Sequence, residues 1–132
     1  MTILPGLTAA FKTIVQTTDT AAAVGSDLPA VLSTPRLVSL LETTAHQALL
    51  PYFTAGQSSV GSRIAIDHLA ATPVGMQIHI QVEVLAVDGR QVFFKVEAWD
   101  ETEKIVTGEH TRFIIDVQRF NDKLKKKFSA RP

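Results

Sequence analysis

Hydrophobic residues recur every three to four positions in one segment of the chain and every second position in the segments that follow it. The helical segment begins at Thr34 and Pro35, where a proline costs no hydrogen bond and where Ser33 or Thr34 can cap the exposed amides. Pro51 ends it near Leu50. Leucines and small residues leave this segment little polar surface, so we expect a long helix that is largely enclosed.

Period-two alternation predicts four strands after the helix. They are Val60–Leu69, Met76–Ala86, Val92–Ala98 and Ile105–Val117. Asp88 and Gly89 form a strong hairpin signal between the second and third of them. In the first strand, alternation places Gly61 and Arg63 on one face. The other face receives Val60, Ser62, Ile64, Ile66 and His68.

The N-terminal part of the chain is more weakly patterned. Thr8–Thr17 has the composition of a strand, and Thr18–Pro29 is small and flexible. We expect the second segment to be a loop or lid with at most one short helical turn, because long loops inside compact domains are often functional.

A strand, a long helix and an antiparallel meander have one economical packing, in which the sheet curls around the helix. This is the hot-dog fold, of class α+β, and at 132 residues we expect one such domain over residues 1–132. The unpaired sheet edges favour a homodimer, possibly a higher oligomer, formed by edge-to-edge pairing.

Composition excludes several classes of protein. The chain has no cysteine, so thiolate zinc sites, iron–sulfur clusters and cysteine nucleophiles are excluded. Thirteen basic and 13 acidic residues cancel, which argues against nucleic acid as a partner. No apolar run is long enough for a membrane span, and the N-terminus lacks a basic export signal, so we expect a cytoplasmic protein. No phosphate loop, dinucleotide fingerprint or metal-ligand cluster appears, so we expect no metal.

Two side chains stand out as candidates for chemistry. Glu42 lies within the apolar helix, where it either occupies a solvated stripe or is a buried functional carboxylate. His68 should face the helix, either as a satisfied core histidine or as an acid–base group. Asp67 points to the opposite face, so Glu42 is the more plausible orienting partner for His68.

Three further residues are weaker candidates. Thr34 is explained by helix capping alone. If it is helical it stands about 12 Å along the axis from Glu42, so the two can share a site only if the helix start or a second chain intervenes, as at a dimer interface. Arg112, on the same strand face as Gly108 and His110, suits either a structural ion pair or an anionic ligand. Gly61 allows a backbone amide to approach a ligand or merely eases strand curvature. The lysine-rich segment 121–132 is a solvated end or, less favourably, a contact for an anionic ligand.

Longer stretches of the chain resemble a known family, the hot-dog thioesterases related to fluoroacetyl-CoA thioesterase. The resemblance runs from Val31 to Lys123 and is sharpest in the HLAATPVG segment, His68–Gly75. It implies catalytic roles for Thr34, Glu42 and His68. It also implies substrate contacts by Gly61 and Arg112.

One departure concerns the lid. The fluoroacetate enzyme closes its site with aromatic residues, whereas this chain has Leu28 before Pro29 and no aromatic residue in 18–27. The resemblance therefore supports thioester hydrolysis more than a preference for fluoroacetate. We expect Leu28 and Val31 to line a small apolar acyl pocket, with contributions from Val60 and Phe53.

The sequence thus predicts an acyl-CoA thioesterase that releases a short or medium acid and CoA. No cofactor is expected, because coenzyme A enters as part of the substrate. His68 would be the general acid and base, Glu42 the nucleophile or the base that orients water, and Thr34 the group that positions the carbonyl. The alternative is a hot-dog protein that binds an acyl-CoA or another small apolar ligand without turnover.

Overall fold

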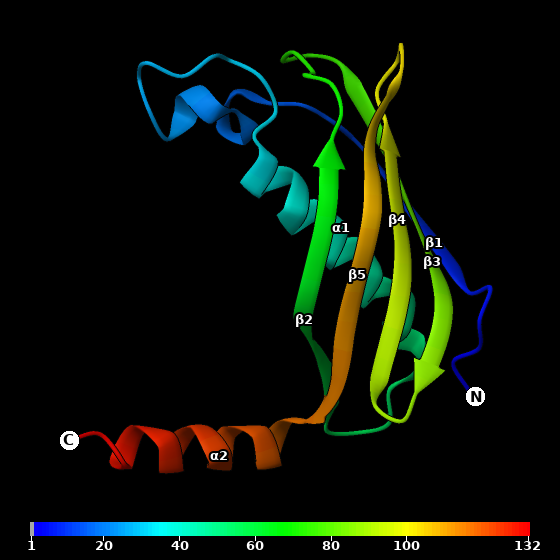
Figure 1. The fold of residues 1–132 in the computed structure, drawn as a ribbon, viewed down its shortest axis with the longest axis vertical. Helices are drawn as coiled ribbons and strands as arrows, with labels where there is room; N and C mark the ends of the chain where they lie inside the picture. The colour runs from blue at the N-terminus through cyan, green and yellow to red at the C-terminus, as the bar shows by residue number, and fades with distance from the viewer. Residues whose placement is uncertain (1) are drawn as a thin grey trace.

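The computed structural model describes residues 2–132 and shows one long helix lying in the curve of a five-stranded antiparallel sheet (Figure 1). The strands are β1 (Thr8–Ile14), β2 (Gln57–His68), β3 (Gln77–Asp88), β4 (Gln91–Trp99) and β5 (Lys104–Asp116). The helices are α1 (Thr34–Leu49) and α2 (Val117–Ser129), with short 3₁₀ turns η1 (Thr17–Asp19), η2 (Ala21–Ala23) and η3 (Leu50–Tyr52). The predicted α+β hot-dog architecture is confirmed.

Helix α1 begins with a cap from its preceding residue. The Oγ of Ser33 accepts a hydrogen bond from the amide of Arg36 at 3.2 Å, and Pro35 occupies the first turn. Ser33 satisfies one of the open amides by itself, so the hydroxyl of Thr34 remains available for another partner.

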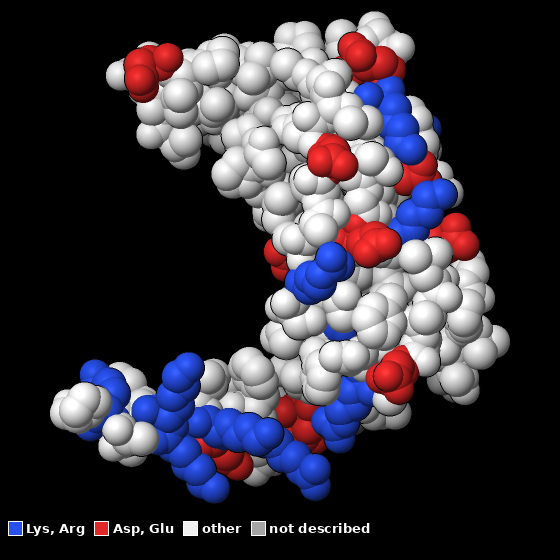
Figure 2. Space-filling view, in the orientation of Figure 1, with Lys and Arg blue, Asp and Glu red and all other residues white. Residues whose placement is uncertain are grey.

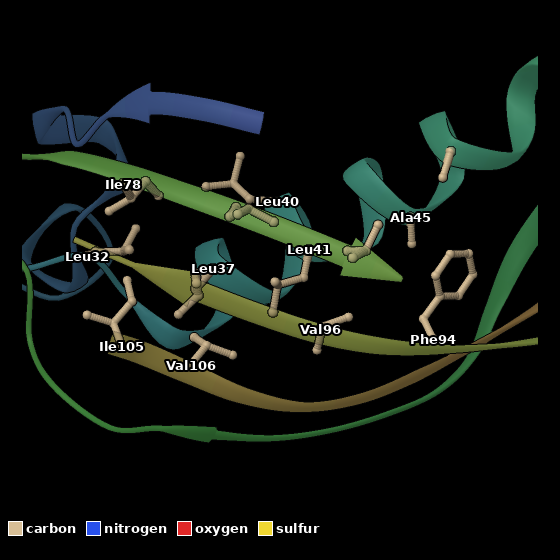
Figure 3. Packing of buried hydrophobic residues seen from close by; sticks show 14 of the residues in the cluster. Leu32, Leu37, Leu40, Leu41, Ala45, Ile78, Phe94, Val96, Ile105 and Val106 are labelled. Carbon is tan, nitrogen blue, oxygen red and sulfur yellow. The ribbon is translucent and has the colours of Figure 1, made fainter. Parts of the chain in front are cut away.

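The hydrophobic core lies between α1 and the concave face of the sheet (Figure 3). Leu37, Leu41 and Leu49 of α1 are fully buried. The sheet contributes alternate residues of its central strands to the same core, among them Ile78, Ile80, Val82, Val84, Val92, Phe94, Val96 and Ala98. Each buried Leu, Ile, Val or Phe side chain stabilises the fold by about 1.5–3 kcal/mol, so this contact fixes where α1 sits on the sheet.

The strand order is β1-β3-β4-β5-β2, so the predicted four-strand meander is wrong for its first strand. Strand β2 pairs with β5 and forms one edge of the sheet. Gly108 explains part of this pairing, because a β-carbon there would collide with the carbonyl of Ala65 and lie 2.8 Å from Ile66 Cα. The alternation of polar and apolar residues within one strand cannot show that two strands far apart in the sequence will pair this closely.

A β-bulge in β2 corrects the predicted strand faces. The register with β5 shifts between Gly61 and Arg63. Because of this extra residue, Gly61 faces α1 together with Ile64 and His68, whereas alternation alone had placed it on the opposite face. Val60 borders a groove on the outer side of the sheet and therefore does not line an acyl pocket at α1.

The predictions for the C-terminal segment and for the lid also change. The basic segment 121–132 is not a plain solvated tail, because residues 117–129 form α2, whose N-cap Asp116 accepts from the amide of Arg119 at 3.0 Å. The lid holds two 3₁₀ turns where at most one was expected.

Across residues 2–132, neither helix has the length and hydropathy needed to cross a membrane.

Candidate active site

The first residue of α1 and the last residue of β2 meet at one end of the molecule. Thr34 Oγ1 lies 2.8 Å from His68 Nδ1, which is hydrogen-bonding distance. The predicted position of His68 on the α1 face is confirmed. Its orienting partner, however, is Thr34 and not Glu42, because the N-terminus of α1 and the C-terminus of β2 converge there.

The other ring nitrogen of His68 has no partner. Nε2 is shielded from solvent and makes no hydrogen bond to the described residues. Burial lowers the pKa of His68 below its ordinary value of 6.5, and the backbone of Ala70 opposes this with a smaller effect. The imidazole is therefore mainly neutral at pH 7, with Nδ1 oriented by Thr34 and Nε2 without a partner among the described residues.

This pair borders a hollow of about 560 Å³ between the lid and the turn after β2. Leu28 and Val31 line it, as the sequence predicted. The other lining residues are small or apolar: Ala21, Val24, Leu32, Ser33, Pro35, Leu69, Ala70 and Ala71. Phe53 is not among them and instead lies beside His46, with the two rings tilted and their centroids 5.7 Å apart. The hollow suits an apolar group of modest size next to a polar pair.

Glu42 borders a second hollow, of about 460 Å³, further along α1. Its side chain is 40% exposed, so the expected water-shielded carboxylate is wrong for the single chain. Glu42 Oε2 lies 3.4 Å from Arg112 Nη1. Thr34 and Glu42 therefore border different hollows of one chain, and Pro35 borders both.

Arg112 is the buried cation of this second hollow. Its side chain is 7% exposed, and its guanidinium donates to Ser59 Oγ at 2.7 Å and to the Ser59 carbonyl at 3.0 Å. Nη1 also lies 3.2 Å from His110 Nε2. Burial lowers the pKa of Arg112, and Glu42 acts in the opposite direction. Nε and Nη2 of the planar guanidinium are held by Ser59 on β2. Its third nitrogen, Nη1, is thereby directed at the carboxylate of Glu42.

Gly61 supplies the space for this carboxylate. A β-carbon at position 61 would lie 2.7 Å from Glu42 Oε2 and 3.2 Å from His110 Cε1. A side chain at position 61 would therefore displace the Glu42 carboxylate from this position, and the bulge is what turns Gly61 toward α1.

Sequence reasoning missed two residues of this cluster. His46 Nδ1 lies 2.7 Å from Ser59 Oγ, and both border the second hollow. Burial and then the charge of Arg112 lower the pKa of His46. His46 stands one helical turn after Glu42, a spacing that could have linked the two. Ser59 gave no signal, because its orientation depends on the bulge.

No three or more histidine or acidic side chains gather into a possible metal site in the part of the chain that the structure describes. The chemistry available is that of an oriented imidazole, a hydroxyl, a carboxylate and a fixed guanidinium.

Comparison with known proteins matches this geometry to one family. Residues 15–118 fit the family model described as Fluoroacetyl-CoA-specific thioesterase. A fluoroacetyl-CoA thioesterase of Streptantibioticus cattleyicolor is 34% identical over 105 residues, which cover 80% of this chain and 76% of the relative.

Solved structures agree with the assignment. A structure of the fluoroacetyl-CoA thioesterase superposes with a TM-score of 0.92 at 28% identity, covering 96% of this chain and 98% of the other. A mutant of that enzyme solved with fluoroacetate and CoA gives a TM-score of 0.83 at 28% identity, over 89% and 99% of the two chains.

The fold recurs in a hot-dog-like protein from Thermanaerovibrio acidaminovorans, with a TM-score of 0.89 at 23% identity over 96% and 94% of the chains. The match to the family model spans most of this sequence, and the curated relative is similar over four-fifths of it. The chain therefore belongs to the fluoroacetyl-CoA-specific thioesterase family.

Proposed function

We propose that this chain hydrolyses short or medium acyl-CoA thioesters to the free acid and CoA, with Thr34, Glu42 and His68 as its catalytic residues. The observation that carries the proposal is the 2.8 Å contact between Thr34 and His68 at the edge of an apolar hollow. Membership of a thioesterase family supports the same reaction class.

The Thr34 hydroxyl suits a histidine that must change its protonation state. A hydroxyl can donate to a bare Nδ1 or accept from a protonated one. For Nε2 of His68 to take a proton from the attacking water, Nδ1 must already carry the other ring proton, so the Thr34 hydroxyl accepts from Nδ1 before and after the transfer and keeps the ring in place. The same nitrogen can then deliver the proton to the leaving thiolate, so one imidazole serves as base and acid.

The start of α1 supports the negative charge that forms on the thioester oxygen. Ser33 and Thr34 stand at the N-terminus of α1 and border the hollow with the imidazole. A helix N-terminus carries a partial positive charge, and donors fixed near a developing oxyanion are worth about 3 kcal/mol each. We therefore expect the carbonyl to lie against this end of the helix.

Glu42 joins the reaction in a homodimer in this proposal. Within one chain it borders the other hollow, so we infer that a second copy supplies the carboxylate that works beside His68. The free edge of β2 favours antiparallel pairing with its own copy into one continuous sheet. Glu42 then either attacks the carbonyl or orients the water that does. An acyl group trapped on Glu42 would establish the first route.

The lid favours a broader acyl range than fluoroacetate. Leu28 and Val31 bring aliphatic surface to the hollow, and residues 18–27 hold no aromatic side chain. One methylene in such a pocket changes specificity by about 10- to 200-fold, so acyl length should matter strongly. Gly61 and Arg112 complete the proposed substrate contacts beside Glu42.

A thiol-release assay across acyl-CoA chain lengths tests the proposal. We expect the wild-type protein to release CoA from short acyl thioesters and His68→Ala to lose at least about 100-fold in kcat. The matched control is His79→Ala, because His79 lies on β3 beside Trp99 with ring centroids 5.8 Å apart, outside both hollows. Binding of acyl-CoA without thiol release would instead favour the non-catalytic alternative.

A further inference from the structure

Helix α2 concentrates the positive charge of a chain that is neutral overall. Residues 117–132 hold six of the 13 basic residues and one of the 13 acidic ones, which leaves seven basic and 12 acidic residues in 1–116. The C-terminal segment therefore carries a net charge of +5 and the rest of the chain −5. Figure 2 shows the basic side chains gathered over α2 and the acidic ones spread over the sheet.

The charge of α2 is ordered along one side of the helix. Arg119, Lys123 and Lys127 follow one another at intervals of four residues and form what we call the cationic stripe. An apolar stripe of Phe120, Leu124 and Phe128 runs directly beside it at the same spacing. A helix with two such stripes fits a surface that is apolar below and anionic at one side.

The apolar stripe has little cover within its own chain. Leu124 is 49% exposed and Phe128 63% exposed. A helix of 13 residues is marginal in water by itself, so α2 needs a surface to pack against. The solved thioesterase that superposes at 0.92 covers 96% of this chain, so the match extends into α2.

The position of α2 indicates a second copy of this chain as that surface. In Figure 1, α2 leaves the end of β5 and extends past the free edge of β2, and the lid projects to the same side at the opposite end of the sheet. Antiparallel pairing of two β2 edges inverts one copy relative to the other. That inversion brings α2 of each copy beside the lid of its partner.

The acyl hollow needs cations that its own chain does not bring to it. Its lining contains Thr34 and His68 but no lysine or arginine. Coenzyme A carries a diphosphate and a 3′-phosphate, which require positively charged donors for tight binding. Arg119 and Lys123, together with Arg90, border a groove of about 650 Å³ with apolar walls at the start of α2, which offers room for a nucleotide.

We propose that α2 is the phosphate-binding element of the acyl-CoA site in the partner subunit. The apolar stripe anchors the helix on the second copy, and the cationic stripe contacts the phosphates of the coenzyme. This inference rests on the proposed thioesterase function and adds a binding element to it that acts in trans.

The test replaces the cationic stripe by Arg119→Gln, Lys123→Gln and Lys127→Gln in one variant. We expect its KM for acyl-CoA to rise about tenfold, as the loss of three exposed charge contacts implies, with kcat within twofold. For the matching acyl-pantetheine, which lacks the nucleotide phosphates, both constants should stay as in the wild-type protein. A control variant removes three exposed cations outside α2, by Lys12→Gln, Arg63→Gln and Lys95→Gln, and should leave KM unchanged.

Mixed dimers test the assignment in trans. A chain with His68→Ala and an intact α2 is paired with a chain that carries the three Gln substitutions. The working site then receives its helix from the His68→Ala chain, so KM should return to the wild-type value. A KM that stays raised would place α2 on its own chain's site and overturn the proposal.

The remaining outcomes separate this inference from the function on which it rests. A wild-type protein that hydrolyses neither acyl-CoA nor acyl-pantetheine contradicts the thioesterase function. Hydrolysis with an unchanged KM in the Arg119, Lys123 and Lys127 variant contradicts only the role of α2. Vesicles of phosphatidylserine test the other use of a basic amphipathic helix: binding that depends on the stripe, with KM unaffected, would assign α2 to a membrane surface instead.

Discussion

Gly61 and Glu42 face each other so closely that a methyl group on residue 61 would lie 2.7 Å from the Glu42 carboxylate oxygen. The bulge in β2 creates this relationship, because it turns Gly61 from the outer side of the sheet toward α1. Arg112 holds the same carboxylate at 3.4 Å. The missing side chain at position 61 therefore determines where the carboxylate can lie.

Replacing this glycine should damage activity more than stability. In Gly61→Ala the new methyl group displaces Glu42, whose flexible and 40% exposed side chain can turn toward solvent. We expect kcat to fall about tenfold while the free energy of unfolding changes by less than about 1 kcal/mol. Steady-state kinetics and urea denaturation measure the two effects.

A double-mutant cycle identifies the cause of that loss. If Gly61→Ala acts through the carboxylate, it should add little to the effect of Glu42→Gln. Fully additive losses would mean that position 61 acts on the substrate directly, for example through its backbone amide.

The Thr34–His68 pair predicts a particular dependence of activity on pH. Burial lowers the pKa of His68, so its neutral form persists at pH values where a free histidine is already protonated. The acid limb of kcat/KM should therefore fall below pH 6.5, with activity lost as pH decreases through it. A limb at or above 6.5 would contradict the assignment of His68 as the base.

Removing the orienting hydroxyl should weaken catalysis without removing it. Thr34→Val keeps the shape of the side chain but loses the 2.8 Å contact with Nδ1, and we expect kcat to fall about 10- to 100-fold. Thr34→Ser keeps the hydroxyl and serves as the matched control, with kcat near the wild-type value. A Thr34→Val variant with the kcat of the wild-type protein would mean that the hydrogen bond to His68 does not contribute to catalysis.

Two arginine–glutamate contacts, that of Arg112 on β5 with Glu42 on α1 and that of Arg63 on β2 with Glu109 on β5, provide a matched comparison of stability. Arg112 is 7% exposed and donates twice to Ser59, whereas Arg63 is 58% exposed and lies 3.5 Å from Glu109. Lysine keeps the charge but not the planar fork. We expect Arg112→Lys to lower the free energy of unfolding by about 2 kcal/mol and Arg63→Lys by under about 0.5 kcal/mol. Thermal or chemical denaturation of both variants measures the two losses in the free energy of unfolding, and equal losses would contradict this prediction.

The parts of the fold that depend on local pattern were predictable. The helix start at Thr34 follows from Ser33, Pro35 and the leucine spacing, and the facing of His68 follows from alternation after the bulge. The pairing of Thr34 with His68 was not predictable, because it depends on where the ends of α1 and β2 converge. Glu42 was misjudged for a similar reason: helical spacing gives its face but not the nearby Arg112.

Long-range features gave weaker signals or none. The bulge at Gly61 reverses strand parity, so Val60 and Gly61 were assigned to the wrong faces. Helix α2 was overlooked because its lysines dominate the composition of the segment. The spacing of Phe120, Leu124 and Phe128 was nevertheless present in the sequence, and it would have predicted an amphipathic helix.

Leu28 of the lid should control the preference for acyl chain length. Leu28 is 45% exposed and borders the hollow with His68, so an aromatic side chain there should narrow the space for an acyl group. In Leu28→Phe we expect kcat/KM for butyryl-CoA to fall about tenfold relative to acetyl-CoA. Leu28→Met conserves the volume and should keep the wild-type preference. Equal kcat/KM ratios in all three proteins would exclude Leu28 from the acyl site.

The apolar stripe of α2 predicts a measurable role in assembly. Leu124 and Phe128 are exposed in the single chain, so aspartate at both positions should leave its fold intact and its circular dichroism unchanged. If these side chains are buried on a second copy, their removal forfeits about 1.5–3 kcal/mol each, and the dimer dissociation constant should rise at least about 100-fold. Leu85→Asp is the control, because Leu85 is equally exposed, at 47%, but lies on β3 away from α2. Sedimentation at micromolar concentration distinguishes the outcomes: a dimer that persists in the double variant would mean that β2 pairing alone holds the copies together and that α2 packs elsewhere.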